Sequence, residues 1–356
     1  MLKAKTEYRA LGLMSGTSLD GLDMAICNFQ IKRGIWKHNL EKAQTIKYPK
    51  ELHDSLKNAY YSSAKEIAGL DSKLGKFIGE ASSKFLKKAK LKVNLIASHG
   101  HTVFHEPENG YTFQIGNGAE IAAETGIQTI CDFRSVDVAK GGQGAPLVPI
   151  GDKFLFPEFD ACLNLGGFAN ISFDNEYGRR IAFDICAVNF VLNRLSNKLG
   201  MDFDNKGKIA SSGIIISELF KELNKLEFYQ QKLPKSLGQE WVEKNVQPLL
   251  SKKYKSEDLL RTFTEHVAIQ ISKVLNDIKG NRILVTGGGV YNNYLIQLLS
   301  LKCKKEIVVP TKLLIDFKEA LIFAFLGVLR LRGEVNSLAT VTGASSDSIN
   351  GCIYFP

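Results

Sequence analysis

Three glycine-rich turns constrain this chain most, because each of them follows a run of β-forming residues. They read SGTSLDGLD at 15–23, NLGGFANIS at 164–172 and TGGGVYNN at 286–293. Glycine at such turns lets backbone N–H groups approach an anion closely, since no side chain stands in the way. A single turn of this kind favours a structural role. Three in one chain, two of them with Ser, Thr or Asn donors beside the glycines, predict a phosphate and nucleotide cradle.

The spacing of the glycines excludes two common nucleotide sites. None of the turns matches the P-loop pattern GxxxxGK[ST], and none is a clean strand–GxGxxG–helix of the Rossmann type. The residues that we expect to contact the nucleotide are those of the first turn, the asparagine and glycines of the second, and the glycines of the third: Gly16, Thr17, Ser18, Leu19, Asp20, Gly21, Leu22, Asp23, Gly166, Gly167, Asn170, Gly287, Gly288 and Gly289.

The pattern around the turns indicates an α/β fold. β-like runs at 8–14 and 24–31 enclose the first turn, helical periodicity fills 51–90, and VNLIAS at 93–98 is typical of a buried strand. The strand–turn–strand shape returns after Asp160, which suggests an internal duplication, and strands then alternate with helices to the end. At roughly 150 residues per domain the length indicates about two domains, which we place at 1–157 and 158–356.

Composition narrows the kind of protein. The chain has 356 residues, of which 44% are hydrophobic and 23% charged, and this describes a soluble globular protein. The N-terminus lacks a hydrophobic leader, and the apolar run 320–329 is about half of a membrane span. We therefore expect a cytoplasmic protein with no membrane contact.

Net charge and cysteine content say less about the function than the glycine-rich turns do. The net charge of +9 is spread along helix-like polar faces such as 73–92 without interleaved aromatic residues, so a solvated basic surface is favoured over nucleic-acid binding. The six cysteines are scattered without CxxC or zinc spacing. They are typical of reduced, mostly buried thiols.

Two further groups of polar residues are candidate ligands. Asp20 and Asp23 in the first turn could hold magnesium through water, because Mg²⁺ prefers hard oxygen ligands and keeps most of its hydration; turn capping is the alternative. The loop SHGHTVFHEP offers His99, His101 and His105 beside Glu106, a set that could bind either zinc or sugar hydroxyls.

Several motifs together resemble a known family. MSGTSLDGLD, ASHGHTVFHEP, DFRSVDVAKGGQGAPLVP, CLNLGGFANIS, PKSLGQE, LVTGGGVYNN, DFKEALIFAFL and VTGAS occur in this order and are similar to motifs of the anhydro-N-acetylmuramic acid kinase family. The resemblance runs from about residue 10 to residue 351. The family belongs to the superfamily of acetate and sugar kinases, chaperone ATPases and actin.

The resemblance implies a fold, a reaction and cofactors. Members of the family have two RNase H-like domains flanking an ATP cleft. The implied enzyme acts in peptidoglycan recycling and uses ATP and Mg²⁺ to open the 1,6-anhydro ring of anhydro-N-acetylmuramic acid. It phosphorylates O6, giving N-acetylmuramate 6-phosphate. Relatives also suggest a homodimer.

The implied chemistry assigns roles to individual residues. Asp184 is the candidate general base for the water that opens the ring, at the end of a strand over 180–183 and the start of a helix; a helix N-cap is its alternative. Arg134 is the partner of the lactyl carboxylate, since guanidinium and carboxylate pair bidentately. Thr102 binds sugar, and Glu319, at a helix start, is a further substrate contact. Asp20 is the candidate magnesium ligand.

Two departures from the family pattern leave alternatives open. The family reads Asp-Thr-Gly-Pro-Gly/Ala-Asn where this chain has Asp184-Ile185-Cys186-Ala187-Val188-Asn189, and glutamine usually stands where this chain has His101. A sugar kinase of the same fold with another substrate is one alternative. A nucleotide-regulated binding protein without transferase activity is the other.

Overall fold

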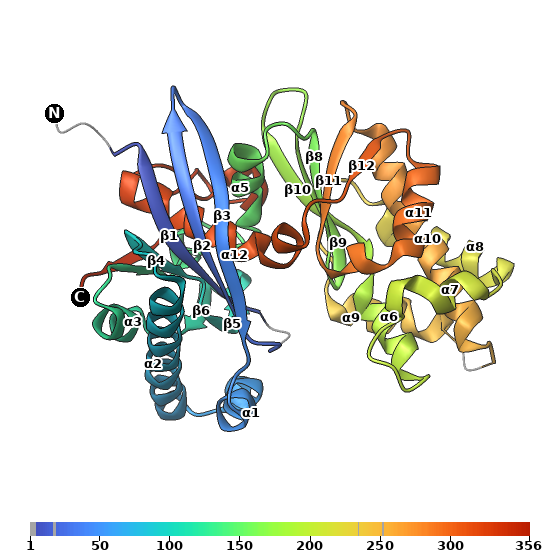
Figure 1. The fold of residues 1–356 in the computed structure, drawn as a ribbon. Helices are drawn as coiled ribbons and strands as arrows, with labels where there is room; N and C mark the ends of the chain where they lie inside the picture. Colours follow the sequence, from blue (N-terminus) through green and yellow to red (C-terminus); the bar gives the residue numbers. More distant parts are fainter. Residues whose placement is uncertain (1–4, 17–18, 234, 251–252) are drawn as a thin grey trace. The chain divides into compact units, whose positions relative to one another are not determined.

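The computed structural model describes residues 5–16, 19–233, 235–250 and 253–356. The chain divides into two compact units (Figure 1): unit 1 contains residues up to Phe156 together with Phe317–Pro356, and unit 2 is Pro157–Asp316. The break after Phe156 lies beside the expected boundary. Residues 317–356, which we expected in the second domain, instead belong to unit 1.

Unit 1 is built on a mixed six-stranded sheet with the order β13-β7-β4-β1-β2-β3. Strands β1, β2 and β3 are antiparallel, whereas β4 is parallel to β1 and β7 is parallel to β4. The strands are β1 (Glu7–Ser15), β2 (Leu22–Lys32), β3 (Ile35–Ile46), β4 (Leu95–Ser98), β7 (Thr129–Cys131) and β13 (Cys352–Tyr354), with a separate hairpin of β5 (His101–Glu106) and β6 (Tyr111–Ile115).

Helices cover both faces of this sheet. Leu11 and Leu13 of β1 point toward α2, where Leu74 and Ile78 belong to the same core cluster. Gly12 faces the opposite way, and a Cβ there would lie 1.8 Å from the carbonyl oxygen of Ala320 in α12, so α12 packs directly on the strand. The helices are α1 (Lys50–Asn58), α2 (Ala64–Ala89), α3 (Gly118–Thr125), α4 (Ser135–Ala139), α5 (Val148–Leu155), α12 (Lys312–Arg332) and α13 (Ala339–Thr342).

Unit 2 repeats the same topology. Its sheet has the order β10-β9-β8-β11-β12, in which β8, β9 and β10 are antiparallel and β11 and β12 continue in parallel. When the strands are numbered within each sheet in chain order, both sheets place the third strand first, then the second, first, fourth and fifth, and β13 adds a sixth in unit 1; this is the RNase H-like arrangement. The expected duplication is thus visible in strand order. The strands are β8 (Ala161–Leu165), β9 (Phe168–Asp174), β10 (Arg180–Ala187), β11 (Arg282–Thr286) and β12 (Glu306–Val308).

One long helix organises the core of unit 2. Helix α10 (Ser256–Asp277) contacts α6 (Asn189–Asn197), α7 (Lys208–Ser212), α8 (Ser217–Lys225), α11 (Asn293–Lys302) and strand β10. Phe263, Val267 and Ile271 of α10 are fully buried in the core cluster that also contains β8 and β11. Unit 2 also contains the short α-helix α9 (Gln239–Asn245).

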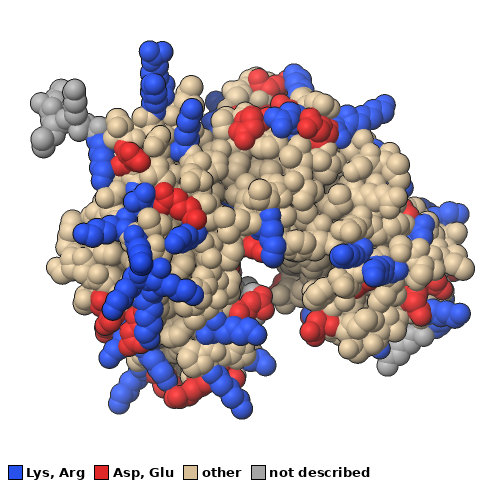
Figure 2. Space-filling view, viewed as in Figure 1, with Lys and Arg blue, Asp and Glu red and all other residues tan. Residues whose placement is uncertain are grey.

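The surface of unit 1 is basic over one helix. Figure 2 shows lysine and arginine side chains gathered over the region of α2, whose exposed residues include Lys65, Lys73, Lys76, Lys84 and Lys87. Lys73 pairs with Glu51 at 3.0 Å, so part of this charge is neutralised locally. Among the described residues, no helix has the length and apolar content needed to cross a membrane.

Candidate active site

The unit 1 part of the candidate site lies at the carboxyl ends of β1 and β4. These strands run parallel, with Leu13 opposite Ser98, and the backbone N–H of His99 donates to the carbonyl oxygen of Leu13 at 3.0 Å. Ligands of open α/β sheets bind beyond the carboxyl ends of the strands. Ser15 is the last residue of β1 and His99 follows directly after β4. Both therefore lie at the edge of the sheet where ligands of such folds bind.

Ser15 is part of a buried chain of three side chains. The Tyr48 hydroxyl donates to Ser15 Oγ at 2.7 Å, and Ser15 Oγ lies 3.1 Å from Nδ1 of His101. Burial raises the pKa of Tyr48 to about 12 and lowers the pKa of His101, so Tyr48 keeps its proton and His101 is neutral. Ser15 Oγ thus accepts from Tyr48 and shares a second hydrogen bond with the neutral His101 ring, so the first glycine-rich turn starts from a fixed residue. Neither Ser15 nor Tyr48 is among the site residues selected from the sequence.

The first turn is only partly described. Thr17 and Ser18, the expected phosphate donors, lie outside the described residues. Leu19 has a φ of 58°, and the Asp20 side chain that follows is exposed. An exposed carboxylate at this turn fits the kind of ligand that magnesium binds through water.

The last residues of the turn already belong to β2. The whole Leu22 residue is only 1% exposed and is paired with Ser15 on one side and Ile46 on the other, so Leu22 belongs to the sheet and does not face a nucleotide as expected. Asp23 accepts a hydrogen bond from Thr45 Oγ1 at 2.5 Å. Residues 22 and 23 therefore form the strand that anchors the turn.

Arg134 is held by a neutral histidine. Its Nε and Nη2 donate to Nε2 of His99 at 3.0 and 2.8 Å, and its Nη1 donates to the Gly144 carbonyl oxygen at 2.6 Å. His99 Nδ1 lies 2.9 Å from the Gly100 carbonyl oxygen, so the ring proton is on Nδ1. Burial, and then the charge of Arg134, keep the pKa of His99 well below its usual value. The three bonds leave Arg134 one N–H on Nη1 and one on Nη2, since a guanidinium has five N–H donors.

Glu319 lies within the electrostatic reach of Arg134. Desolvation within the protein raises the pKa of Glu319, and the positive charges of Arg134 and Lys318 lower it. The pKa of Glu319 is raised overall, although its side chain reaches solvent. Helix α12 begins at Lys312, but Phe317 has a non-helical φ of −121°. Glu319 therefore starts the second segment of the helix rather than the helix itself.

The histidines of the SHGHTVFHEP loop point to different partners. His99 faces Arg134 and His101 faces Ser15, whereas His105 Nδ1 lies 3.1 Å from Thr112 Oγ1. Within the part of the chain that the structure describes, no group of three His, Cys, Asp or Glu side chains could hold a metal ion. The zinc alternative therefore finds no support there. Thr102, in β5, accepts from Gln114 Nε2 at 3.4 Å.

In unit 2 the second and third glycine-rich turns lie side by side. Strands β8 and β11 are parallel, with Asn164 opposite Thr286. Gly287 has a φ of +86°, and a Cβ there would lie 2.5 Å from Asn164 Oδ1 and 2.8 Å from the Leu165 carbonyl oxygen. Only glycine fits this close approach. The turn at 287–289 therefore packs onto the end of β8, beside the turn at 166–167.

The start of α6 forms hydrogen bonds to the second glycine-rich turn. The backbone N–H of Val188 donates to the Gly167 carbonyl oxygen at 2.8 Å, and that of Asn189 donates to the Gly166 carbonyl oxygen at 3.3 Å. Asn189 Nδ2 also donates to the Leu165 carbonyl oxygen at 3.3 Å. Residues Gly166 and Gly167 are thus fixed between α6 and the third turn.

A row of polar residues crosses the unit 2 sheet beside these turns. The strand register places Thr286 opposite Asn164, Asn164 opposite Asn170, and Asn170 opposite Asp184. Residues that are directly opposed in neighbouring strands project from the same face of the sheet. Asn170 therefore stands between Asn164 and Asp184 on one face, and Asn164 and Thr286 join the candidate site although the sequence analysis did not select them.

Asp184 does not begin a helix. Strand β10 continues to Ala187, and α6 begins at Asn189 with Val188 as its N-cap, so the N-cap alternative is wrong. The register shifts between Asp184 and Cys186, which is the signature of a β-bulge. The four residues that depart from the family pattern, 185–188, are at most 2% exposed and belong to the core.

The loop at 235–237, which is distant in the sequence, holds Asp184 by hydrogen bonds. The Asp184 backbone N–H donates to the Lys235 carbonyl oxygen at 3.0 Å, and Asp184 Oδ2 accepts from the Leu237 backbone N–H at 2.8 Å and from Ser236 Oγ at 3.2 Å. Among the described residues, both bonds to the carboxylate go to Oδ2, which leaves Oδ1 for a ligand. Burial raises the pKa of Asp184, and the two hydrogen bonds lower it. This is the balance that a general base requires, since it must be ionised and yet accept a proton.

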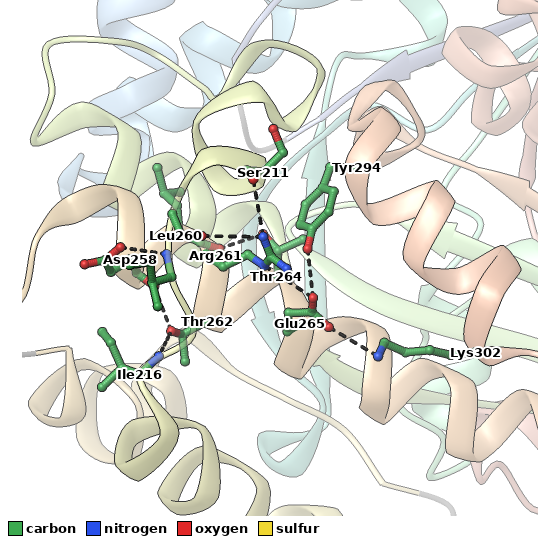
Figure 3. Close-up of polar contacts among 12 residues, drawn as sticks. Ser211, Ile216, Asp258, Leu260, Arg261, Thr262, Thr264, Glu265, Tyr294 and Lys302 are labelled. Atoms are coloured by element: carbon green, nitrogen blue, oxygen red, sulfur yellow. Dashed lines mark hydrogen bonds and ion pairs between the residues drawn. The ribbon is translucent and has the colours of Figure 1, made fainter.

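A charged network holds the helix that follows the third turn (Figure 3). Glu265 of α10 accepts from the Tyr294 hydroxyl at 2.8 Å and forms ion pairs with Arg261 and Lys302, both at 3.3 Å. Tyr294 and Lys302 lie at the two ends of α11. Arg261 also donates to the Ser211 carbonyl oxygen at 3.3 Å. One buried carboxylate therefore fixes α11, and with it the end of the 287–289 turn, against the core.

Two RNase H-like units, with glycine-rich turns at the strand ends of each, define the class of protein as the superfamily of acetate and sugar kinases, chaperone ATPases and actin. The family model described as "Anhydro-N-acetylmuramic acid kinase" matches residues 8–356. The chain belongs to this family.

Individual relatives agree with the family model over the whole chain. An anhydro-N-acetylmuramic acid kinase of Francisella tularensis subsp. novicida is 35% identical over 98% of this chain and 100% of its own length. One of Caldanaerobacter subterraneus subsp. tengcongensis is 33% identical over 98% of this chain and 97% of its own. Among solved structures, the activator of the 2-hydroxyisocaproyl-CoA dehydratase from Clostridium difficile with bound ADPNP is a distant likeness, with a TM-score of 0.44 and 17% identity over 92% and 98% of the two chains.

Proposed function

We propose that this chain is an ATP-dependent kinase that hydrolytically opens the 1,6-anhydro ring of anhydro-N-acetylmuramic acid and phosphorylates O6. The contacts of Asp184 are the observation that supports the proposal most. Among the described residues, Ser236 and Leu237 hold Oδ2 and leave Oδ1 for a ligand. Asp184 also lies opposite Asn170, beside two glycine-rich turns. Family membership supplies the substrate class.

Arg134 binds the lactyl carboxylate of the sugar in this proposal. Its contacts with His99 and Gly144 fix the guanidinium plane and leave one N–H on each terminal nitrogen. Two parallel N–H donors match a carboxylate bidentately. Glu319 and Thr102 then contact sugar hydroxyls from α12 and β5.

Asp184 supplies the base for ring opening. Oδ1 accepts a proton from water as the water oxygen bonds to the anomeric carbon, and the bond from that carbon to O6 breaks. O6 then bonds to the γ-phosphorus of ATP, and ADP leaves. The product is heavier than the anhydro sugar by one water and one phosphoryl group, with the Asp184 proton returned to solvent.

The glycine-rich turns bind the nucleotide in this proposal. Backbone N–H groups of 16–21, 166–167 and 287–289 approach the phosphate oxygens, and Asn170 adds a side-chain amide. Magnesium, when bound, neutralises charge on the phosphates. Asp20 would hold it through water, because the structure offers an exposed carboxylate there and no cage of several carboxylates among the described residues.

ADP release with and without the sugar tests this function. The wild type should release ADP only when anhydro-N-acetylmuramic acid is present. Asp184→Asn should lose this activity while still binding ATP, and Asp184→Glu should keep a fraction of it. ADP release that is indifferent to the sugar contradicts the kinase and favours a nucleotide-regulated binding protein.

We also infer a cytoplasmic homodimer from the family resemblance. Sedimentation of the purified chain at micromolar concentration tests the dimer, and a monomer contradicts it.

A further inference from the structure

Two cysteines face each other across a strand pair in unit 1. Strand β13 pairs antiparallel with β7, and Cys352 is the direct partner of Cys131. Directly opposed residues in antiparallel strands share one face, with Cα atoms about 4.5 or 5.5 Å apart according to the type of pair. Both separations fall within the range of roughly 4.4–6.8 Å that a disulfide bridges.

The two thiols are more exposed to solvent than those of the other cysteines. Cys352 is exposed and Cys131 is partly buried, whereas Cys27, Cys162, Cys186 and Cys303 are buried, and all six are free thiols. Burial, followed by the nearby Cys352, raises the pKa of Cys131 to about 12. Burial and the Asp132 carboxylate raise the pKa of Cys352, although Arg330 opposes them. Both thiols are therefore protonated at neutral pH, and Cys352 is the one that a reagent reaches first.

The pair adjoins the loop that carries Arg134. Cys352 Sγ lies 3.9 Å from Asp132 Oδ2, and Asn350 Nδ2 donates to the Phe133 carbonyl oxygen at 2.9 Å. Asp132 has a φ of +58° and accepts from the Ser135 backbone N–H at 3.3 Å. The C-terminal segment thus contacts Asp132 and Phe133 through the Cys352 and Asn350 side chains, directly after the residues that pair with β13.

We propose that Cys131 and Cys352 form a redox modification site, which a small-molecule disulfide oxidises to an intrachain disulfide between β7 and β13. The Cys352 thiolate attacks one sulfur of the reagent and releases the first small thiol. Cys131 then attacks the mixed disulfide at the Cys352 sulfur and releases the second thiol. Two protein thiols become one disulfide, the reagent disulfide becomes two thiols, and the two protein protons end on those thiols.

The bond would fix the edge strand of the sheet and the loop before Arg134. Terminal strands are the segments most prone to fray, and β13 is joined to β7 by three residue pairs. A covalent link across the first of these pairs removes that freedom. Residues 132–134 would then exchange amide hydrogens more slowly in the oxidised protein.

Oxidation of the full chain with oxidised glutathione tests the proposal. Because the pKa of Cys352 is raised, we would treat the folded protein above the pKa of about 8.5 of an ordinary thiol, alkylate it after unfolding, and map the peptides. A linked peptide pair containing Cys131 and Cys352, two hydrogens lighter than the free peptides, is expected. So are a higher melting temperature and reversal of both effects by dithiothreitol.

Two variants make the result decisive. Cys352→Ser should yield no crosslink and leave Cys131 alkylatable, whereas Cys303→Ser, which removes a buried thiol elsewhere, should crosslink as the wild type does. A stable glutathione adduct on Cys352 without the crosslink overturns the proposal. So does recovery of both cysteines as free thiols.

Discussion

Ser236→Ala tests which contacts determine the proton affinity of the candidate base, Asp184. Ser236 Oγ donates to Asp184 Oδ2 at 3.2 Å, beside the 2.8 Å bond from the Leu237 backbone N–H. The substitution removes the first bond and keeps the second. Because the Ser236 side chain is exposed, alanine leaves no cavity and the fold should be unaffected.

The size of the effect follows from the bond that is lost. A hydrogen bond to a charged group contributes about 1.5–3 kcal/mol, and the length of this one and its access to water favour the lower end. About 1.4 kcal/mol corresponds to a tenfold change in proton affinity. Since the hydroxyl stabilises the ionised carboxylate, its loss should raise the proton affinity of Asp184 roughly tenfold.

The pH profile of kcat/KM is the assay. The acidic limb should move to higher pH in Ser236→Ala, while the plateau at higher pH and the KM for ATP change little. Ser236→Thr keeps a hydroxyl and should restore the wild-type profile. Carbon-13 NMR titration of labelled aspartate reports the same shift at Asp184 without turnover. An unchanged acidic limb, with an unchanged titration, would refute the role given to Ser236.

Three other predictions concern binding and stability. Arg134→Lys cannot pair bidentately with a carboxylate, so steady-state kinetics should show the KM for the sugar raised by about tenfold or more and the KM for ATP unchanged; an unchanged sugar KM contradicts the binding role. Gly12→Ala places a Cβ 1.8 Å from the Ala320 carbonyl oxygen and should lower the free energy of unfolding by about 1–3 kcal/mol, which urea denaturation measures. Burial lowers the pKa of His266 to about 3, whereas the unfolded chain takes up this proton near pH 6.5. Stability should therefore be full above pH 6.5 and fall by about 1.4 kcal/mol per pH unit below it, and His266→Gln should flatten that slope in pH-dependent melting; an equally steep slope in the variant contradicts it.

The sequence revealed the elements with strong apolar patterns. Strands β1 and β2 were expected close to their observed bounds, and helical structure was expected over 51–90, where α1 and α2 lie, because the hydrophobic periodicity there is regular. Strand β3 was missed since much of IWKHNLEKAQTI is polar and only partly buried, as is usual at a sheet edge. Strand β13 was missed for a different reason. It has three residues and forms only through pairing with β7, far away in the sequence.

The candidate site was predicted by residue type but not by contact. Gly166, Gly167, Asn170 and the glycines 287–289 were selected because three glycine-rich turns after β-forming runs in one chain favour an anion-binding role over a purely structural one. The Asp184 contacts to Ser236 and Leu237, and the pairing of Arg134 with His99, join residues 35 to 53 positions apart. Only tertiary packing decides such contacts, and a single sequence does not record it. The bulge that lets β10 continue past Asp184 is likewise a property of the sheet.

The structure of the product tests the central claim most directly. The wild type, incubated with ATP, Mg²⁺ and anhydro-N-acetylmuramic acid, should give one product whose phosphorus couples to the two protons on C6 and whose anomeric carbon bears a free hydroxyl, as phosphorus and proton NMR detect. Asp184→Asn should give none. An intact anhydro ring, or a phosphate on an oxygen other than O6, would contradict the account.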